Sequence, residues 1–169
     1  FQTPGHSWSL NDLASRYEPL VSLDGGSSFA RWSICNARVS LQEYQRYGSN
    51  DADGDDAPLY VFDPDFLKET STFSNGDSVV AEFSPIPPCF SQDKMACCNG
   101  SSFRPLPPAW LLVGACRSGT PIHNHPMTVA WNALLSGCKL WCCWPPNEPA
   151  HFLLLYLDVS IQELSLILI

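Results

Sequence analysis

The sequence is poor in basic side chains. Of its 169 residues, 9 are Lys or Arg and 17 are Asp or Glu, which gives a formal net charge of −8 at pH 7. Non-specific binding to nucleic acid requires a basic surface that neutralises phosphate groups. The charge balance therefore argues against nucleic acid as a direct partner.

A C-x-x-C pair, which would suggest a zinc site, is absent from the sequence. The eight cysteines include no C-x-x-C pair, and two pairs are adjacent, Cys97-Cys98 and Cys142-Cys143. No signal peptide is evident, which disfavours a secreted disulfide scaffold. Cys138, Cys142 and Cys143 lie in an apolar stretch, where free cysteine behaves as a small hydrophobic residue. We therefore expect reduced thiols and an intracellular protein, in the nucleus or the cytoplasm.

A long apolar run without charged side chains is also missing. The tail His151–Ile169 is strongly apolar, but Asp158, Gln162 and Glu163 interrupt it. A segment of this length would barely span a bilayer, and an acid near its centre is costly there. We predict a strand or a short amphipathic helix that caps the core, and no membrane contact.

The composition that is present, with 15 prolines, 10 glycines and 12% aromatic residues, is typical of a turn-rich β protein with inserted helices. Ser9 is a suitable N-cap for a first helix, with Asp12 in the capping-box position and Pro19 as its stop. Ser40 begins a second helix, with Glu43 in the same position. Both helices are interpreted as structural.

The apolar runs predict five strands: Phe29–Val39, Pro58–Phe62, Trp110–Val113, Ala130–Leu135 and Cys138–Trp144. The last two are expected to form a tight hairpin around Ser136-Gly137. Residues 68–109 show no long periodic pattern, so we expect little regular structure there.

The acidic loop Asn50–Asp56 resembles the beginning of an EF-hand calcium loop. Counted from Asp51, however, the sixth position is Asp56 where the motif needs Gly, and the twelfth is Phe62 where it needs Glu. A solvated loop is the better interpretation.

A polar constellation lies within the stretch Trp110–Pro146. In an extended strand, His123 and His125 point to the same face, and two convergent imidazoles suit a borderline transition metal. Lys139 lies in an apolar run, and a buried ammonium is costly unless it meets an anion. The pattern favours a metal site with an anionic ligand nearby. A pair of histidines in a turn before Pro126 remains an alternative from the residues alone.

Three segments carry the motifs of a known family: PLYVFD (58–63), RPLPPAWLLVGACRSGTPIHNHP (104–126) and AWNALLSGCKLWCCWPP (130–146). They resemble the Jumonji-C (JmjC) family of Fe(II)- and 2-oxoglutarate-dependent dioxygenases, in its phosphatidylserine-receptor-like lysyl hydroxylase and arginine demethylase subgroup. The resemblance implies a mainly β fold, a double-stranded β-helix (jelly-roll, cupin-like) with N-terminal helices. It covers about 1–149, with a helical lead-in over about 1–57 and the β-helix part over about 58–149.

The resemblance also implies the site. His123 matches the first iron ligand, and His125 stands where the family's H-x-D motif has its acidic ligand. The residues that match the 2-oxoglutarate pocket are Tyr60, Thr120, Asn132 and Lys139. An ammonium and a hydroxyl suit a carboxylate in a dry pocket. For Tyr60, an ordinary core aromatic is an equally simple interpretation.

Two features depart from the family. The neutral His125 removes one negative charge from the usual two-His, one-carboxylate triad, and Asp63 or Asp65 could supply the missing carboxylate. The distal iron-binding histidine is not found after Pro149, and 150–169 does not match the family. With Phe1 as its first residue, the chain is expected to be a fragment or a processed product, incomplete at its C-terminal end.

The implied function is hydroxylation or demethylation of a protein, at a Lys or Arg side chain, with Fe(II) and 2-oxoglutarate. Two alternatives remain open. One is a catalytically silent JmjC module that acts by binding. The other is a cupin-like protein that binds metal through H-x-H, which leaves Thr120 and Lys139 unexplained.

Overall fold

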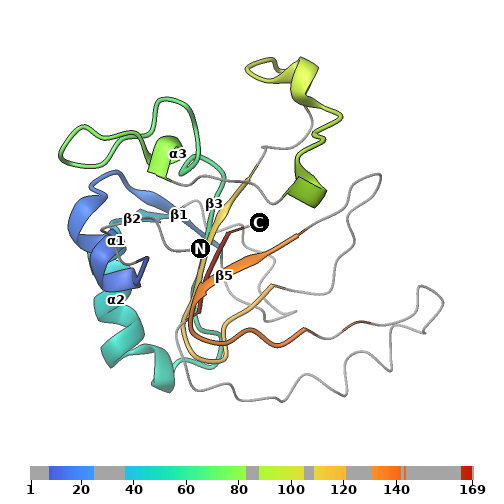
Figure 1. Ribbon diagram of the computed structural model, residues 1–169. Coiled ribbons are helices and arrows are strands. Elements are labelled where there is room, and N and C mark those ends of the chain that lie inside the picture. The colour runs from blue at the N-terminus through green and yellow to red at the C-terminus, as the bar shows by residue number, and fades with distance from the viewer. Residues whose placement is uncertain are drawn as a thin grey trace.

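The computed structural model of the chain describes residues 8–24, 37–82, 88–104, 109–120, 131–141, 143 and 165–168. In these residues a six-stranded sheet has the order β2-β1-β3-β4-β6-β5, and every pairing is antiparallel (Figure 1). The strands are β1 (Val21–Asp24), β2 (Arg38–Val39), β3 (Tyr60–Asp63), β4 (Leu111–Gly114), β5 (Ala133–Ser136) and β6 (Ser165–Leu168). The prediction of a mainly β protein is confirmed.

Helices α1 (Leu10–Arg16) and α2 (Leu41–Asn50) pack against each other beside the sheet (Figure 1). The Ser9 hydroxyl accepts the Asp12 N–H at 3.2 Å. Ser40 and Glu43 form a complete capping box. These caps satisfy N–H groups that the first helical turn leaves without partners. Both predicted helix starts are confirmed.

The remaining helical elements are short. They are α3 (Val79–Glu82) and the 3-10 turns η1 (Ala52–Gly54), η2 (Pro88–Phe90) and η3 (Ala96–Cys98). Within the described part of 68–109, α3, η2 and η3 are the only helices, and the prediction of little regular structure is confirmed.

The two faces of the β3–β4 pair bury different side chains. Val61, Leu111 and Val113 belong to the main core with residues of both helices, including Leu13 and Leu41. The opposite face carries a smaller cluster: Tyr60 and Leu112, with Phe62 and Trp110 packed against them. This division follows the alternation of side chains along a strand.

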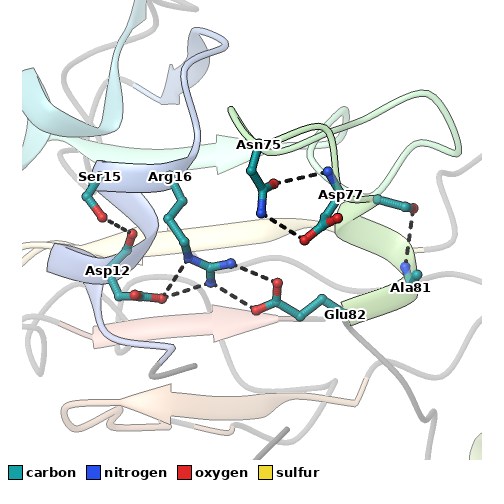
Figure 2. Close-up of polar contacts among 8 residues, drawn as sticks. Asp12, Ser15, Arg16, Asn75, Asp77, Ala81 and Glu82 are labelled. Carbon is teal, nitrogen blue, oxygen red and sulfur yellow. Dashed lines mark hydrogen bonds and ion pairs between the residues drawn. The ribbon is translucent and has the colours of Figure 1, made fainter. Parts of the chain in front are cut away.

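Arg16 joins α3 to α1 (Figure 2). Its guanidinium donates to both carboxylate oxygens of Glu82, at 2.7 and 2.9 Å, and to Asp12 Oδ2 at 2.8 and 3.0 Å. It also lies 4.2 Å from the centre of the Phe73 ring. A two-pronged Arg–carboxylate pair fixes orientation as well as distance, so this contact anchors the chain that follows β3.

The predicted hairpin between Ala130–Leu135 and Cys138–Trp144 is wrong. Strand β5 pairs with β6, and the described residues 138–141 and 143 form no strand. The side chains of Leu140 and Trp141 are 50% and 57% exposed. The apolar segment SLIL of β6 lies beside β5 instead, and it also pairs with the buried strand β4.

The tail prediction left a strand and a helix open, and Ser165–Leu168 is a strand. Residues 151–164, and most of the predicted strand Phe29–Val39, lie outside the described residues, and only Arg38–Val39 of the latter is seen as β2. Across the part of the chain that the structure describes, no helix has the length and apolarity needed to cross a membrane.

Candidate functional site

Two of the predicted pocket residues meet each other. The Lys139 ammonium donates a hydrogen bond to Asn132 Oδ1 at 3.2 Å. Asn132 directly precedes β5, and Lys139 follows the turn at Gly137, whose φ of 81° is favourable for glycine. The two side chains therefore converge from either side of the strand and its turn.

The Lys139 ammonium is partly removed from water. Burial lowers the pKa of Lys139 from its ordinary value of 10.5, because desolvation disfavours the charged form. Its Nζ also lies 4.3 Å from the centre of the Trp141 ring, a cation–π contact that compensates in part. Neither the Asn132 amide oxygen nor the Trp141 ring carries a negative charge, so these two contacts only partly offset the positive charge of Lys139. This favours an anionic ligand at Lys139.

Tyr60 and Thr120 lie at one end of the β3–β4 pair. Tyr60 is 3% exposed and stands opposite Gly114 in the register. The chain then turns at Ala115–Ser118, where the Ser118 N–H and hydroxyl both donate to the Ala115 carbonyl, and leads to the partly exposed Thr120. Tyr60 packs with Leu112, as the core interpretation expects. The prediction that Tyr60 lines a cosubstrate pocket stays a prediction.

The hydroxyl of Tyr44 fastens α2 to the same end of the sheet. It accepts the Ala115 N–H at 2.9 Å and lies 2.8 and 3.0 Å from the carbonyl oxygens of Leu59 and Val113, which share its proton. Burial raises the pKa of Tyr44 far above its ordinary value of 10, so the hydroxyl keeps its proton at neutral pH. One buried group thus joins the start of β3 to the end of β4.

Arg117 holds the next turn against the acidic loop. Its φ is 62°, a left-handed conformation that is uncommon outside glycine. Its Nη2 donates to the carbonyl oxygens of Ala52, Asp53 and Asp55 at 3.2, 2.9 and 2.9 Å. The predicted solvated loop is therefore partly fixed, and its backbone supports the segment that leads to Thr120.

Sequence reasoning missed Tyr44 and Arg117. A tyrosine on the apolar side of a helix indicates burial, and a buried hydroxyl needs a partner. The partners Val113 and Ala115 lie far along the chain, so no local pattern identifies them. For Arg117, the adjacent Ser-Gly turn was the available signal.

The Asp63 carboxylate accepts hydrogen bonds from the backbone. Asp63 is 1% exposed, and its carboxylate accepts three backbone N–H groups, from Ser22 at 2.7 Å, Asp65 at 2.7 Å and Phe66 at 2.8 Å. Asp65 pairs with Lys68 at 2.6 Å. The suggestion that Asp63 supplies the missing iron carboxylate is therefore not supported.

The predicted metal ligands His123 and His125 lie outside the described residues. Among the residues that are described, no group of three or more His, Cys, Asp or Glu side chains could hold a metal ion. The prediction of a metal site at these two histidines therefore stays a prediction.

We expect Tyr44→Phe to lower the free energy of unfolding by about 2 kcal/mol, because a buried N–H left without its acceptor costs roughly 1–3 kcal/mol. Chemical denaturation measures the change, and hydrogen exchange at the Ala115 amide should speed up. Ser49→Ala is the control, since its hydroxyl makes an exposed contact on the same helix. Equal stability of Tyr44→Phe and the wild type would contradict this role.

The sheet, its two capped helices and the half-buried lysine together define an antiparallel β protein in which Lys139 is a candidate anion-binding side chain. The bifunctional arginine demethylase and lysyl-hydroxylase psr-1 of Caenorhabditis elegans is similar, with 36% identity over 147 residues, which is 84% of this chain and 32% of that protein. The psr-1 protein of Caenorhabditis briggsae is 33% identical over 144 residues, 84% of this chain and 33% of that protein.

The arginine-specific demethylase JMJ22 of Arabidopsis thaliana is 28% identical over 163 residues, covering 82% of this chain and 30% of that protein. The chain therefore spans about a third of the length of these curated relatives. No protein-family model matches the chain, and no solved structure matches it significantly. The similarity to these demethylases and hydroxylases supports the resemblance drawn from the motifs: the chain belongs to the JmjC family.

Proposed function

We propose that the chain is part of a JmjC protein hydroxylase or demethylase that uses Fe(II) and 2-oxoglutarate. The observation that carries the proposal is the Lys139–Asn132 contact, with its 3.2 Å hydrogen bond and the lowered pKa of Lys139. A partly desolvated ammonium gains most from an anion that can bind it directly. A carboxylate of 2-oxoglutarate fits this donor set.

In this proposal Lys139 and Thr120 bind the distal carboxylate, while Asn132 and Tyr60 line the same pocket. His123 and His125 hold the iron. The bound metal and cosubstrate supply the oxidation by O2, and the protein positions them and excludes water. The Tyr44 hydroxyl supports the proposed site by joining the start of β3 to the end of β4.

The protein substrate, with a Lys or Arg side chain as the target, is proposed from the names of the relatives, which are arginine demethylases and lysyl-hydroxylases. A location in the nucleus or cytoplasm suits such a substrate. We further propose that residues 1–149 form the JmjC-like domain and that its sheet belongs to a double-stranded β-helix. Strand β6, from the segment that follows, joins the same sheet between β4 and β5.

An anaerobic titration of the purified chain with Fe(II) and 2-oxoglutarate tests the proposal. The expected result is a visible charge-transfer band between iron and cosubstrate. Binding of 2-oxoglutarate without this band would mean that the pocket forms but that the metal site with His125 fails, which favours the silent-module alternative. Absence of both in a folded chain would refute the proposal.

A further inference from the structure

Cys97 and Cys98 form an exposed dithiol away from the predicted pocket residues in the sequence. Their sulfur atoms are 3.8 Å apart. Cys97 is exposed, and Cys98 is partly exposed. Both are free thiols, as the sequence predicted. Neither residue takes part in the proposed dioxygenase function, so the inference drawn from them is independent of it.

The turn that carries the two thiols is held by its own hydrogen bonds. The Cys98 N–H donates to the Met95 carbonyl at 2.8 Å, and the Ser101 N–H donates to the Cys98 carbonyl at 3.0 Å. Arg104 Nη1 ties the two sides of the turn by donating to Asp93 Oδ2 at 3.0 Å and Asn99 Oδ1 at 2.7 Å. The two sulfur atoms are therefore presented together by an ordered turn, and do not have to be brought together by a ligand.

The spacing does not favour a disulfide between the two cysteines. Cα atoms joined by a trans peptide are about 3.8 Å apart, whereas disulfides usually need about 4.4–6.8 Å. A single bridging atom has no such requirement. At a tetrahedral angle, two bonds of about 2.3 Å, the length of a zinc–sulfur bond, span sulfur atoms roughly 3.8 Å apart. The observed separation thus suits a centre that binds both sulfurs.

The number of available ligands limits which atom could bridge the two sulfurs. A structural zinc site needs four protein ligands, and the described residues contain no group of three or more metal-binding side chains. A trivalent arsenical that keeps one organic substituent needs only two sulfur ligands. The hydrogen bond to Cys97, followed by repulsion from its thiolate, raises the pKa of Cys98.

We propose that Cys97 and Cys98 form a dithiol site that binds a trivalent arsenical by bridging both sulfur atoms. With an arsenic oxide, R–As=O, two As–S bonds form as the bonds from arsenic to oxygen break. The two thiol protons leave with that oxygen as water, and arsenic keeps its oxidation state. Soft thiolate ligands favour such thiophilic centres.

The test uses phenylarsine oxide on the whole chain, followed by intact-protein mass spectrometry. We expect one adduct that survives excess glutathione, a monothiol, and is removed by dithiothreitol. Cys97→Ser and Cys98→Ser should each lose this resistance, with retention at least tenfold lower. Cys89→Ser, which removes a single exposed cysteine, should retain the adduct.

The second adjacent pair requires its own control, and the Cys142→Ser, Cys143→Ser double variant should keep the resistant adduct. Fragmentation of the tryptic peptide 95–117 from the wild type should place the added mass on Cys97 and Cys98 and not on Cys116. This mapping needs no variant to fold. A resistant adduct that survives in Cys97→Ser, or that maps elsewhere, would overturn the proposal, as would the absence of any resistant adduct.

Discussion

Replacing Asp63 with alanine is expected to lower the free energy of unfolding by about 4 kcal/mol. The carboxylate accepts N–H groups from Ser22, Asp65 and Phe66, and each buried N–H that loses its acceptor costs roughly 1–3 kcal/mol. Because whole domains are stable by about 5–15 kcal/mol, this one change should remove a large share of the stability. Urea denaturation followed by tryptophan fluorescence measures it.

Two matched variants show whether the acceptor role is the cause. In Asp63→Asn, the amide oxygen can still accept from Asp65 and Phe66, but the amide nitrogen then faces the Ser22 N–H, so an intermediate loss is expected. Asp65→Ala should change stability by less than about 1 kcal/mol, since it removes only an exposed ion pair with Lys68. Equal effects of Asp63→Ala and Asp65→Ala would rule out the buried role.

The helix starts could be predicted because their signals are local. Ser9 and Ser40 each act on the third residue that follows, so the capping pattern is complete within a few positions. Buried strands with apolar runs, such as Leu111–Gly114, were recognisable for a similar reason. Which strands lie beside them in the sheet could not be predicted in this way.

The hairpin failed because strand pairing is decided by distant segments. Ala133–Ser136 could pair with any apolar strand of suitable length, and the structure pairs it with Ser165–Leu168. Long-range contacts also explain why the roles of Asp63 and Tyr44 were missed, since their partners lie elsewhere in the chain. In the candidate site, the Lys139–Asn132 contact agrees with the motif, while the Ser-Gly turn beside Arg117 indicated a turn but not the carbonyl groups that Arg117 binds.

Lys139→Met is expected to weaken 2-oxoglutarate binding at least 100-fold, which corresponds to about 2.7 kcal/mol. Methionine keeps much of the apolar stem but removes the charge that would neutralise the carboxylate. Isothermal titration calorimetry of 2-oxoglutarate into the Fe(II)-loaded chain under anaerobic conditions measures the affinity. Lys94→Met changes an exposed lysine that is far from Lys139 in the sequence. It is the control and should bind 2-oxoglutarate as the wild type does.

The same lysine gives the binding a characteristic pH dependence. In the free protein, burial lowers the pKa of Lys139 below 10.5. A bound carboxylate raises it again, so binding above the lowered pKa takes up a proton. Affinity should therefore fall as pH rises through that pKa, by at most about tenfold per pH unit for one proton. The free energy of unfolding of the ligand-free chain should instead rise as pH rises through the same pKa, because burying the neutral amine costs less than burying the ammonium.

The most direct test of the cosubstrate site is the calorimetric titration of 2-oxoglutarate into wild type and Lys139→Met side by side, at neutral and at alkaline pH. The account predicts one saturable site in the wild type, weaker at alkaline pH, and no measurable binding in Lys139→Met at either pH. A folded wild type that does not bind, or a variant that binds with the wild-type affinity, would contradict it.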